Sequence, residues 1–209
     1  MAKLAVAKCN LGKFSEAGRL QFHVLESRKT SLGKKHTDTI MAMVTLARTL
    51  RNAGHFDDEV EKMLAEAVEL RHQTLGDSHS DTIAATGELA STLWARSKWP
   101  EVEKLEIEIL EARRRTIGFD HPATIRALAR LANVKLRVGD ARGAMELQLQ
   151  LLNVTRSPLG LRTEGMKDPS TTKAIEDLAR TFSTHGFGAR ATELRDRIKE
   201  IEEAGGSLV

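Results

Sequence analysis

Apolar residues recur at helical spacing along most of the chain. After His36 they fall three and four positions apart, as on one face of a helix: Ile40, Met43, Val44, Ala47 and Leu50. Beyond Gly54 the same spacing resumes with Val60, Met63, Leu64, Ala67 and Val68. The pattern predicts two amphipathic helices that are separated by a break at Gly54 and closed by Leu75-Gly76.

A short polar motif separates such helix pairs and repeats along the chain. It reads Leu/Ile-Gly, two residues, then His-x-x-Thr-Ile, and its histidines are His36, His79 and His121. The first two histidines are 43 residues apart and the next two are 42 apart, and a weaker copy at residues 168–172 starts 47 residues after His121. A period of this length predicts a tandem array in which each helix pair contacts its neighbours.

The repeat predicts an all-α fold in one continuous domain, residues 1–209, without β-strands. Only four prolines and no tyrosine occur in the chain, which also favours helix. We expect about five units at residues 1–33, 34–76, 77–118, 119–160 and 166–203, followed by a frayed tail at 204–209. Phe14, Phe56 and Trp99 should begin second helices.

The first unit lacks the His-x-x-Thr start of the later ones. Its first helix should therefore be short, with an uncapped outer edge. We expect the chain either to be a piece of a longer protein or to be covered by a partner at this edge.

The motifs resemble the tetratricopeptide repeat of the kinesin light chain type. The resemblance rests on Leu-Ala in the first helix, on a glycine and an aromatic residue at the break, and on the Leu-Gly-x-x-His motif between units. Period alone would also fit HEAT or armadillo helices. The small residue after leucine in each first helix favours the tetratricopeptide interpretation: Ala47, Ala90, Ala132 and Ala179.

This resemblance implies a right-handed α-solenoid whose first helices line a concave groove. On that template the candidate peptide-binding residues are Asn10, Val44, Arg48, Arg51, Asn52, Ser91, Trp94, Arg126, Asn133, Arg137, Lys173 and Arg180. Asn10 and Asn52 match positions where the family holds a peptide backbone. The family's other asparagines, just before Leu-Ala, are replaced by Thr45, Glu88 and Arg130, and its usual tyrosines by Leu50, Leu93, Lys135 and Phe182, which indicates a divergent member.

The candidate groove positions are basic, because six cations are opposed only by Glu176. Arginine pairs bidentately with carboxylates, so the expected partner is an acidic peptide. The alternative is a solvated face with pairing within each helix. Trp94 is either an interface anchor or a packing residue against the next unit.

Charge does not favour nucleic acid as the partner. The formal net charge is +3, from 32 basic and 29 acidic side chains. Arg113-Arg114-Arg115 and Lys34-Lys35 lie at or just beyond helix C-termini, where cations complement the helix dipole.

The sequence offers no evident catalytic or metal site. The recurring histidines belong to different units and are too far apart to share a zinc ion, so we interpret them as turn residues. Asp38-Thr39 and Asp81-Thr82 are expected to cap helix starts. No cofactor is predicted, and the lone Cys9 should be a packed residue rather than a nucleophile.

Neither a membrane-spanning run nor a secretory signal is evident, and a single cysteine fits a reducing compartment, so we expect a cytoplasmic protein. The favoured hypothesis is a non-catalytic scaffold that binds an acidic partner segment. The alternative is a self-association or regulatory module of a larger signalling ATPase, working through the uncapped N-terminal edge. No Walker-type phosphate loop occurs in this chain, so the ATPase would lie outside it.

Overall fold

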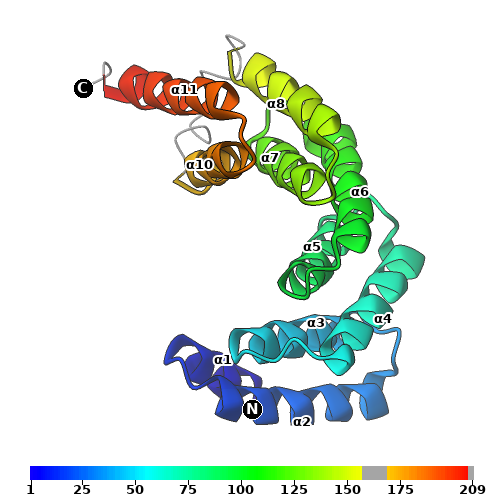
Figure 1. The fold of residues 1–209 in the computed structure, drawn as a ribbon. Coiled ribbons are helices and arrows are strands. Elements are labelled where there is room, and N and C mark those ends of the chain that lie inside the picture. Colours follow the sequence, from blue (N-terminus) through cyan, green and yellow to red (C-terminus); the bar gives the residue numbers. More distant parts are fainter. Residues whose placement is uncertain (157–168, 207–209) are drawn as a thin grey trace. The chain divides into compact units, whose positions relative to one another are not determined.

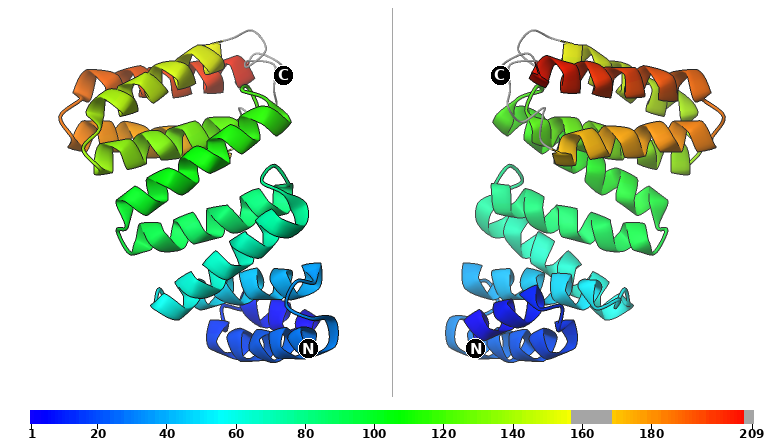
Figure 2. Two further views of the ribbon diagram at one scale, coloured as in Figure 1. Left: turned by 90° about the vertical axis from the view of Figure 1, so that its right-hand side faces the viewer. Right: turned by 90° about the vertical axis from the view of Figure 1, so that its left-hand side faces the viewer.

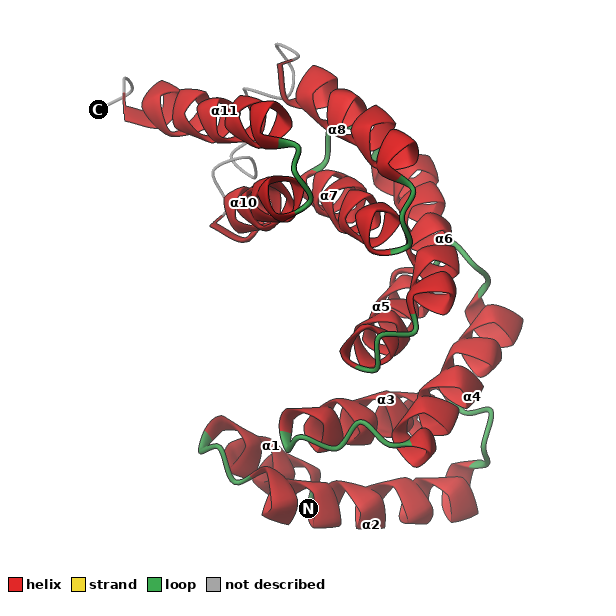
Figure 3. Cartoon of the chain, in the orientation of Figure 1, coloured by secondary structure: helices red, strands yellow, loops and turns green. Residues whose placement is uncertain are grey.

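The chain folds into helices joined by short turns. The computed structural model describes residues 1–156 and 169–206, and within these ranges it contains no β-strand (Figure 3). The helices are α1 (Ala2–Asn10), α2 (Phe14–Leu32), α3 (Thr37–Asn52), α4 (Asp58–Leu75), α5 (Ser80–Ala95), α6 (Trp99–Ile117), α7 (Pro122–Arg137), α8 (Ala141–Arg156), α10 (Pro169–Thr184) and α11 (Gly188–Gly206). The prediction of an all-α fold is confirmed.

Contacts within the chain define two compact units, Met1–Lys98 and Trp99–Val209. In unit 1, α2 packs between α1 and α3, and α4 packs between α3 and α5 (Figure 1). In unit 2, α7 packs against α6, α8 and α10, while α10 also packs against α11 (Figure 2). In each unit, helices that are neighbours in the sequence are therefore neighbours in space, as in a repeat array.

The recurring histidines are the N-terminal caps of α3, α5 and α7. In each case Nδ1 accepts a hydrogen bond, at 3.1 Å, from the backbone N–H two residues later. The imidazoles, rather than Asp38-Thr39 and Asp81-Thr82, supply the side-chain caps. Asp38 and Asp81 do lie in the first turn, where the helix dipole favours negative charge. The threonines of the motif are buried instead: Thr39, Thr82 and Thr124.

An arginine eight residues before each histidine joins one repeat to the next. Arg28 and Arg113 each donate through Nη1 to a backbone carbonyl of the following first helix, at 2.9 Å, those of Asp38 and Ala123. Arg71 instead forms an ion pair with Asp81 Oδ2 at 2.9 Å. Arg113 therefore has a structural contact within the fold.

At the α8–α11 contact the direction of the hydrogen bond is reversed, because here the arginine lies on the later helix. The position that holds arginine in earlier repeats holds the buried Thr155. Arg197 of α11, also buried, donates to Thr155 Oγ1 from Nε at 3.2 Å and to the Thr155 carbonyl from Nη2.

The core forms where first helices meet second helices. The small residue after leucine is fully buried in α3, α5, α7 and α10, which allows close helix approach: Ala47, Ala90, Ala132 and Ala179. Around it lie the larger core residues, such as Met43, Leu64, Leu128 and Phe182. Burying a side chain of this size stabilises the fold by about 1.5–3 kcal/mol.

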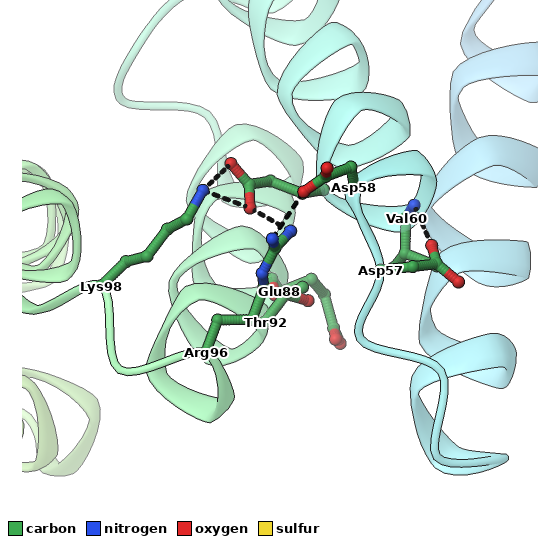
Figure 4. A network of polar contacts seen from close by, with 8 residues as sticks. Asp57, Asp58, Val60, Glu88, Thr92, Arg96 and Lys98 are labelled. Carbon is green, nitrogen blue, oxygen red and sulfur yellow. Dashed lines mark hydrogen bonds and ion pairs between the residues drawn. The ribbon is translucent and has the colours of Figure 1, made fainter.

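The turn within each helix pair needs a residue with positive φ. Glycine holds it after α1, α3, α7 and α10, whereas Ser97 holds it after α5 with φ 57°. A network beside Ser97 ties this turn to the start of α4 (Figure 4). Arg96 pairs with Asp58 and Glu61, and Lys98 Nζ lies 2.8 Å from Glu61 Oε1.

Some predicted boundaries differ from the observed ones. Phe14 and Trp99 begin second helices as expected, but α4 begins at Asp58 because Asp57 Oδ1 caps it by accepting from the Val60 N–H at 3.0 Å. Helix α11 extends to Gly206, beyond the predicted end at residue 203. The unit boundary expected between 160 and 166 lies outside the described residues.

Candidate binding surface

In unit 1 the two charged residues of the predicted set, Arg48 and Arg51, lie on α3 and reach Glu88 on the neighbouring first helix α5. We call this surface the α3–α5 face; it comprises Arg48, Arg51, Asn52, Glu88, Ser91 and Trp94. Arg51 Nη2 lies 2.7 Å from Glu88 Oε2, and Arg51 Nη1 donates to the Glu88 carbonyl at 3.4 Å. Arg48 Nη1 lies 4.0 Å from the other oxygen, Glu88 Oε1. Two guanidinium groups therefore share one carboxylate.

These charged groups differ in exposure. The side chains of Arg51 and Glu88 are each 19% exposed, while that of Arg48 is 54% exposed. Arg48 therefore faces solvent with only a long contact to Glu88. The prediction that Glu176 alone opposes the groove cations is wrong, because Glu88, one residue before Leu-Ala, also reaches them.

The other predicted residues of unit 1 are uncharged. Asn10 and Asn52 are exposed at the C-terminal ends of α1 and α3, and Val44, Ser91 and Trp94 are partly buried. The Ser91 hydroxyl donates to the Gly87 carbonyl at 2.8 Å, so its hydrogen is engaged within the helix.

In unit 2 the predicted residues lie on α7 and α10 and are more strongly tied to the fold. Arg126 Nη1 donates to Thr171 Oγ1 at 3.0 Å and links the two helices. The guanidinium carbon of the exposed Arg137 lies 5.4 Å from the centroid of the Trp99 ring, which is a cation–π geometry. Asn133 is only 8% exposed, so it packs inside rather than contributing to a binding surface.

Two further cations of unit 2 have acidic neighbours. Arg180 is 68% exposed and lies 3.5 Å from Asp177, one turn earlier in α10. Lys173 lines an open hollow of about 330 Å³ together with Pro169, Thr172, Glu176, Ile198 and Glu202. The carboxylates reduce the positive potential here, so unit 2 is less suited to an acidic ligand than the α3–α5 face.

An ion pair in unit 2 has a buried carboxylate and a part-exposed guanidinium, and the sequence did not reveal it. Glu106 of α6 is 1% exposed, and its Oε1 lies 2.6 Å from Arg130 Nη2 on α7. Burial raises the pKa of Glu106, against the opposing effect of Arg130 and Arg113. The repeat itself gives a signal for this burial, since the equivalent positions hold the buried residues Gln21, Leu64 and Gln148.

Lys135 occupies a position where the family usually has tyrosine. Its Nζ lies 2.6 Å from Glu103 Oε1 and 2.9 Å from Asp140 Oδ2. The hydrogen bond with Glu103, followed by that with Asp140, raises the pKa of Lys135. A charge bridge between α6, α7 and the turn that precedes α8 thus replaces an aromatic contact.

Among the described residues, no three His, Cys, Asp or Glu side chains are grouped closely enough to hold a metal ion. No helix in these ranges is long and apolar enough to cross a membrane.

Comparison with known proteins agrees with the helix-pair geometry. The tetratricopeptide repeat family model matches residues 1–38, 39–81 and 82–123. The chain therefore belongs to the tetratricopeptide repeat family. No curated protein sequence matches the chain.

Solved structures of related folds cover nearly the whole chain. A Podosopora anserina putative kinesin light chain with nearly identical TPR-like repeats has a TM-score of 0.81 at 24% identity, covering 96% of this chain and 92% of that one. BtubC (BKLC) from P. vanneervenii has a TM-score of 0.76 at 19% identity, covering 99% and 80%. MamA has a TM-score of 0.62 at 15% identity, covering 97% and 96%. The resemblance to kinesin light chain-like repeats is confirmed at the level of the fold.

Proposed function

We propose that this chain is a non-catalytic scaffold that binds an acidic segment of a partner protein on the α3–α5 face. The tetratricopeptide fold is generally a protein-interaction scaffold. The lone Cys9 is consistent with a reducing compartment, and we propose the cytoplasm. Nucleic acid is a less suitable partner, because Arg113 and Arg114 both have contacts within the fold.

The observation that carries the proposal is the excess of guanidinium groups over carboxylates on this face. Arg48 and Arg51 share Glu88, and Arg48 keeps half of its side chain in solvent. A partner carboxylate that reaches Arg48 would form a charge-assisted hydrogen bond, which is roughly twice as strong as a neutral one. Asn52 and Ser91 offer nearby polar atoms for a peptide backbone.

Fluorescence anisotropy with a labelled oligoglutamate peptide tests this function. We expect saturable binding that weakens as salt is added, because exposed charge pairs are screened. Arg48→Ala should weaken binding about three- to tenfold, in line with the loss of one charge-assisted contact. Arg137→Ala tests whether the α7–α10 side contributes separately.

Arg142→Ala is the matched control, since it removes the same charge from the outer helix α8, where Arg142 is 90% exposed. Equal affinities for wild type, Arg48→Ala and Arg142→Ala would rule out the α3–α5 face as the binding site.

A second candidate function is self-association through the edge formed by α1 and α2. This edge exposes apolar side chains, among them Leu4 at 53% and Val6 at 54%. Val6 and Ala2 also line a mostly apolar cavity of about 190 Å³, together with residues of α2 and α3. Exposed apolar surface of this kind is typical of interfaces, so we propose a second copy of the chain as its occupant.

Light scattering over a range of protein concentrations tests the second candidate. We expect dimers in the wild type and monomers in Val6→Asp, with Leu149→Asp as a control on the outer helix α8, where Leu149 is 44% exposed. A wild type that stays monomeric at high concentration would exclude this function.

A further inference from the structure

We infer that Glu88 is an internal competitor for the acidic partner and thereby sets the charge that a partner must carry. This inference rests on the proposed function of the α3–α5 face. The Glu88 carboxylate forms an ion pair with the guanidinium of Arg51, with which a partner carboxylate would otherwise pair. A ligand must displace it to gain the second arginine.

The geometry favours competition over a purely structural role for Glu88. Arg51 remains held in place without the carboxylate, because its Nη1 also donates to the backbone carbonyl of Glu88 at 3.4 Å. That carbonyl belongs to α5 and stays when the side chain moves. The guanidinium is therefore positioned for a carboxylate whether Glu88 or a partner supplies it.

Partial exposure makes the exchange feasible. The Arg51 and Glu88 side chains each keep 19% of their surface in solvent. The contact oxygen Glu88 Oε2 is covered, so the Glu88 side chain must swing out before a ligand carboxylate takes its place at Arg51. By contrast, the Glu106 side chain is 1% exposed, although its partner Arg130 is 40% exposed. The Glu88 carboxylate can therefore move into solvent, whereas the Glu106 carboxylate is enclosed by the fold.

Glu88 is also a residue that the fold does not require. The equivalent position on α3 is Thr45, whose hydroxyl donates to the Met41 carbonyl at 2.8 Å, and on α7 it is Arg130. Threonine, glutamate and arginine thus all fit one step before Leu-Ala. A carboxylate at this place therefore affects the charge of the surface more than the packing of the helix.

The competition defines a specificity. A partner segment with one carboxylate meets Arg48 alone and binds weakly, while a segment with several closely spaced carboxylates also replaces Glu88 at Arg51. The expected partner is therefore a run of Asp and Glu residues rather than an isolated acidic side chain.

The test measures the affinity of the labelled oligoglutamate peptide for Glu88→Gln and Glu88→Thr. We expect both variants to bind about three- to tenfold more tightly than wild type, equivalent to about 0.6–1.4 kcal/mol. Glu146→Gln, on the outer helix α8, makes the same change in net charge and should stay within about twofold of wild type. In an Arg51→Ala background Glu88→Gln should give a clearly smaller gain, which comes only from the longer contact with Arg48 and assigns most of the competition to Arg51.

The outcomes separate this inference from the proposed function. Suppose that wild type binds the peptide and Arg48→Ala weakens binding, but Glu88→Gln behaves like Glu146→Gln or binds less tightly. Competition by Glu88 would then be refuted, while peptide binding on the α3–α5 face would be supported. If neither wild type nor Glu88→Gln binds the peptide, both are wrong. Thermal melting of each variant verifies that the helices remain folded.

Discussion

Unit 1 and unit 2 place opposite charges at one repeat position. The residue before Leu-Ala is Glu88 on α5 and Arg130 on α7, 42 residues apart. Glu88 pairs with Arg51 between two first helices, at a surface that solvent reaches. Arg130 pairs with Glu106 between a first and a second helix, and that carboxylate is buried. The comparison teaches that the same repeat position forms a solvent-accessible charge pair in one unit and a pair with a buried carboxylate in the other, and only the first is a candidate for binding.

The largest effect is expected on removing the partner of the buried Glu106. Arg130→Ala leaves Glu106 with only Arg113 as a nearby cation, so the free energy of unfolding should fall by about 2–4 kcal/mol. The Arg51–Glu88 pair of unit 1 should matter less, because both side chains keep 19% of their surface in solvent, and Arg51→Ala should cost about 1 kcal/mol or less. Urea unfolding followed by circular dichroism measures both.

A double variant then isolates the buried carboxylate. Once Glu106→Gln has removed the charge, Arg130→Ala should cost about 1 kcal/mol or less. Equal costs of Arg130→Ala with and without Glu106→Gln would mean that the buried charge of Glu106 is not the cause of the cost.

The pH dependence of stability is the next largest effect. The pKa of Glu106 is raised above its ordinary 4.5 by burial, so the folded state binds more protons than the unfolded state between the two pKa values. The contribution of Glu106 to stability must therefore fall as the pH rises from 4.5 through the folded pKa. We expect the unfolding free energy of wild type, minus that of Glu106→Gln, to decrease over this window. A difference that is constant with pH would contradict a buried, pKa-raised Glu106.

The smallest effect concerns the turns, where the two units again differ. Ser97 in unit 1 and Gly139 in unit 2 occupy equivalent turns, both with positive φ, 57° and 87°. Ser97→Gly should stabilise by about 0.5 kcal/mol and Gly139→Ser should destabilise by about 1 kcal/mol, because side chains are disfavoured in this backbone region. No atom lies within 4 Å of a Cβ built at Gly139, so the second variant measures the backbone alone. Effects of the same sign in the thermal melts would contradict this explanation.

Much of the fold was predictable because it depends on local, periodic signals. The spacing of Ile40, Met43 and Ala47 predicted the buried face of α3, and the repeated Leu-Ala predicted the family. The start of α4 was missed, since the aromatic Phe56 was taken as its first residue while Asp57 supplies the cap. A cap depends on a single side-chain hydrogen bond, which hydrophobic spacing does not reveal.

The candidate surface was less predictable, because its properties depend on which side chains meet across helices. The template selected Arg48 and Arg51 from their distance to Leu-Ala, but it gave no sign that Glu88 of the next repeat reaches them. It likewise placed Asn133 in the groove, although α7 is packed against α6, α8 and α10 and buries that residue. Sequence spacing predicts the face of a single helix; it does not predict what a neighbouring helix covers.

The forward-reaching arginines have an evolutionary consequence. Arg28, Arg71 and Arg113 each bond to the first turn of the following helix, and that turn carries its own histidine cap. A tandem duplication of one 42- or 43-residue segment would therefore copy both the arginine and the helix start to which it bonds. Gene lengthening by whole segments would then create new, already matched junctions without any compensating substitution.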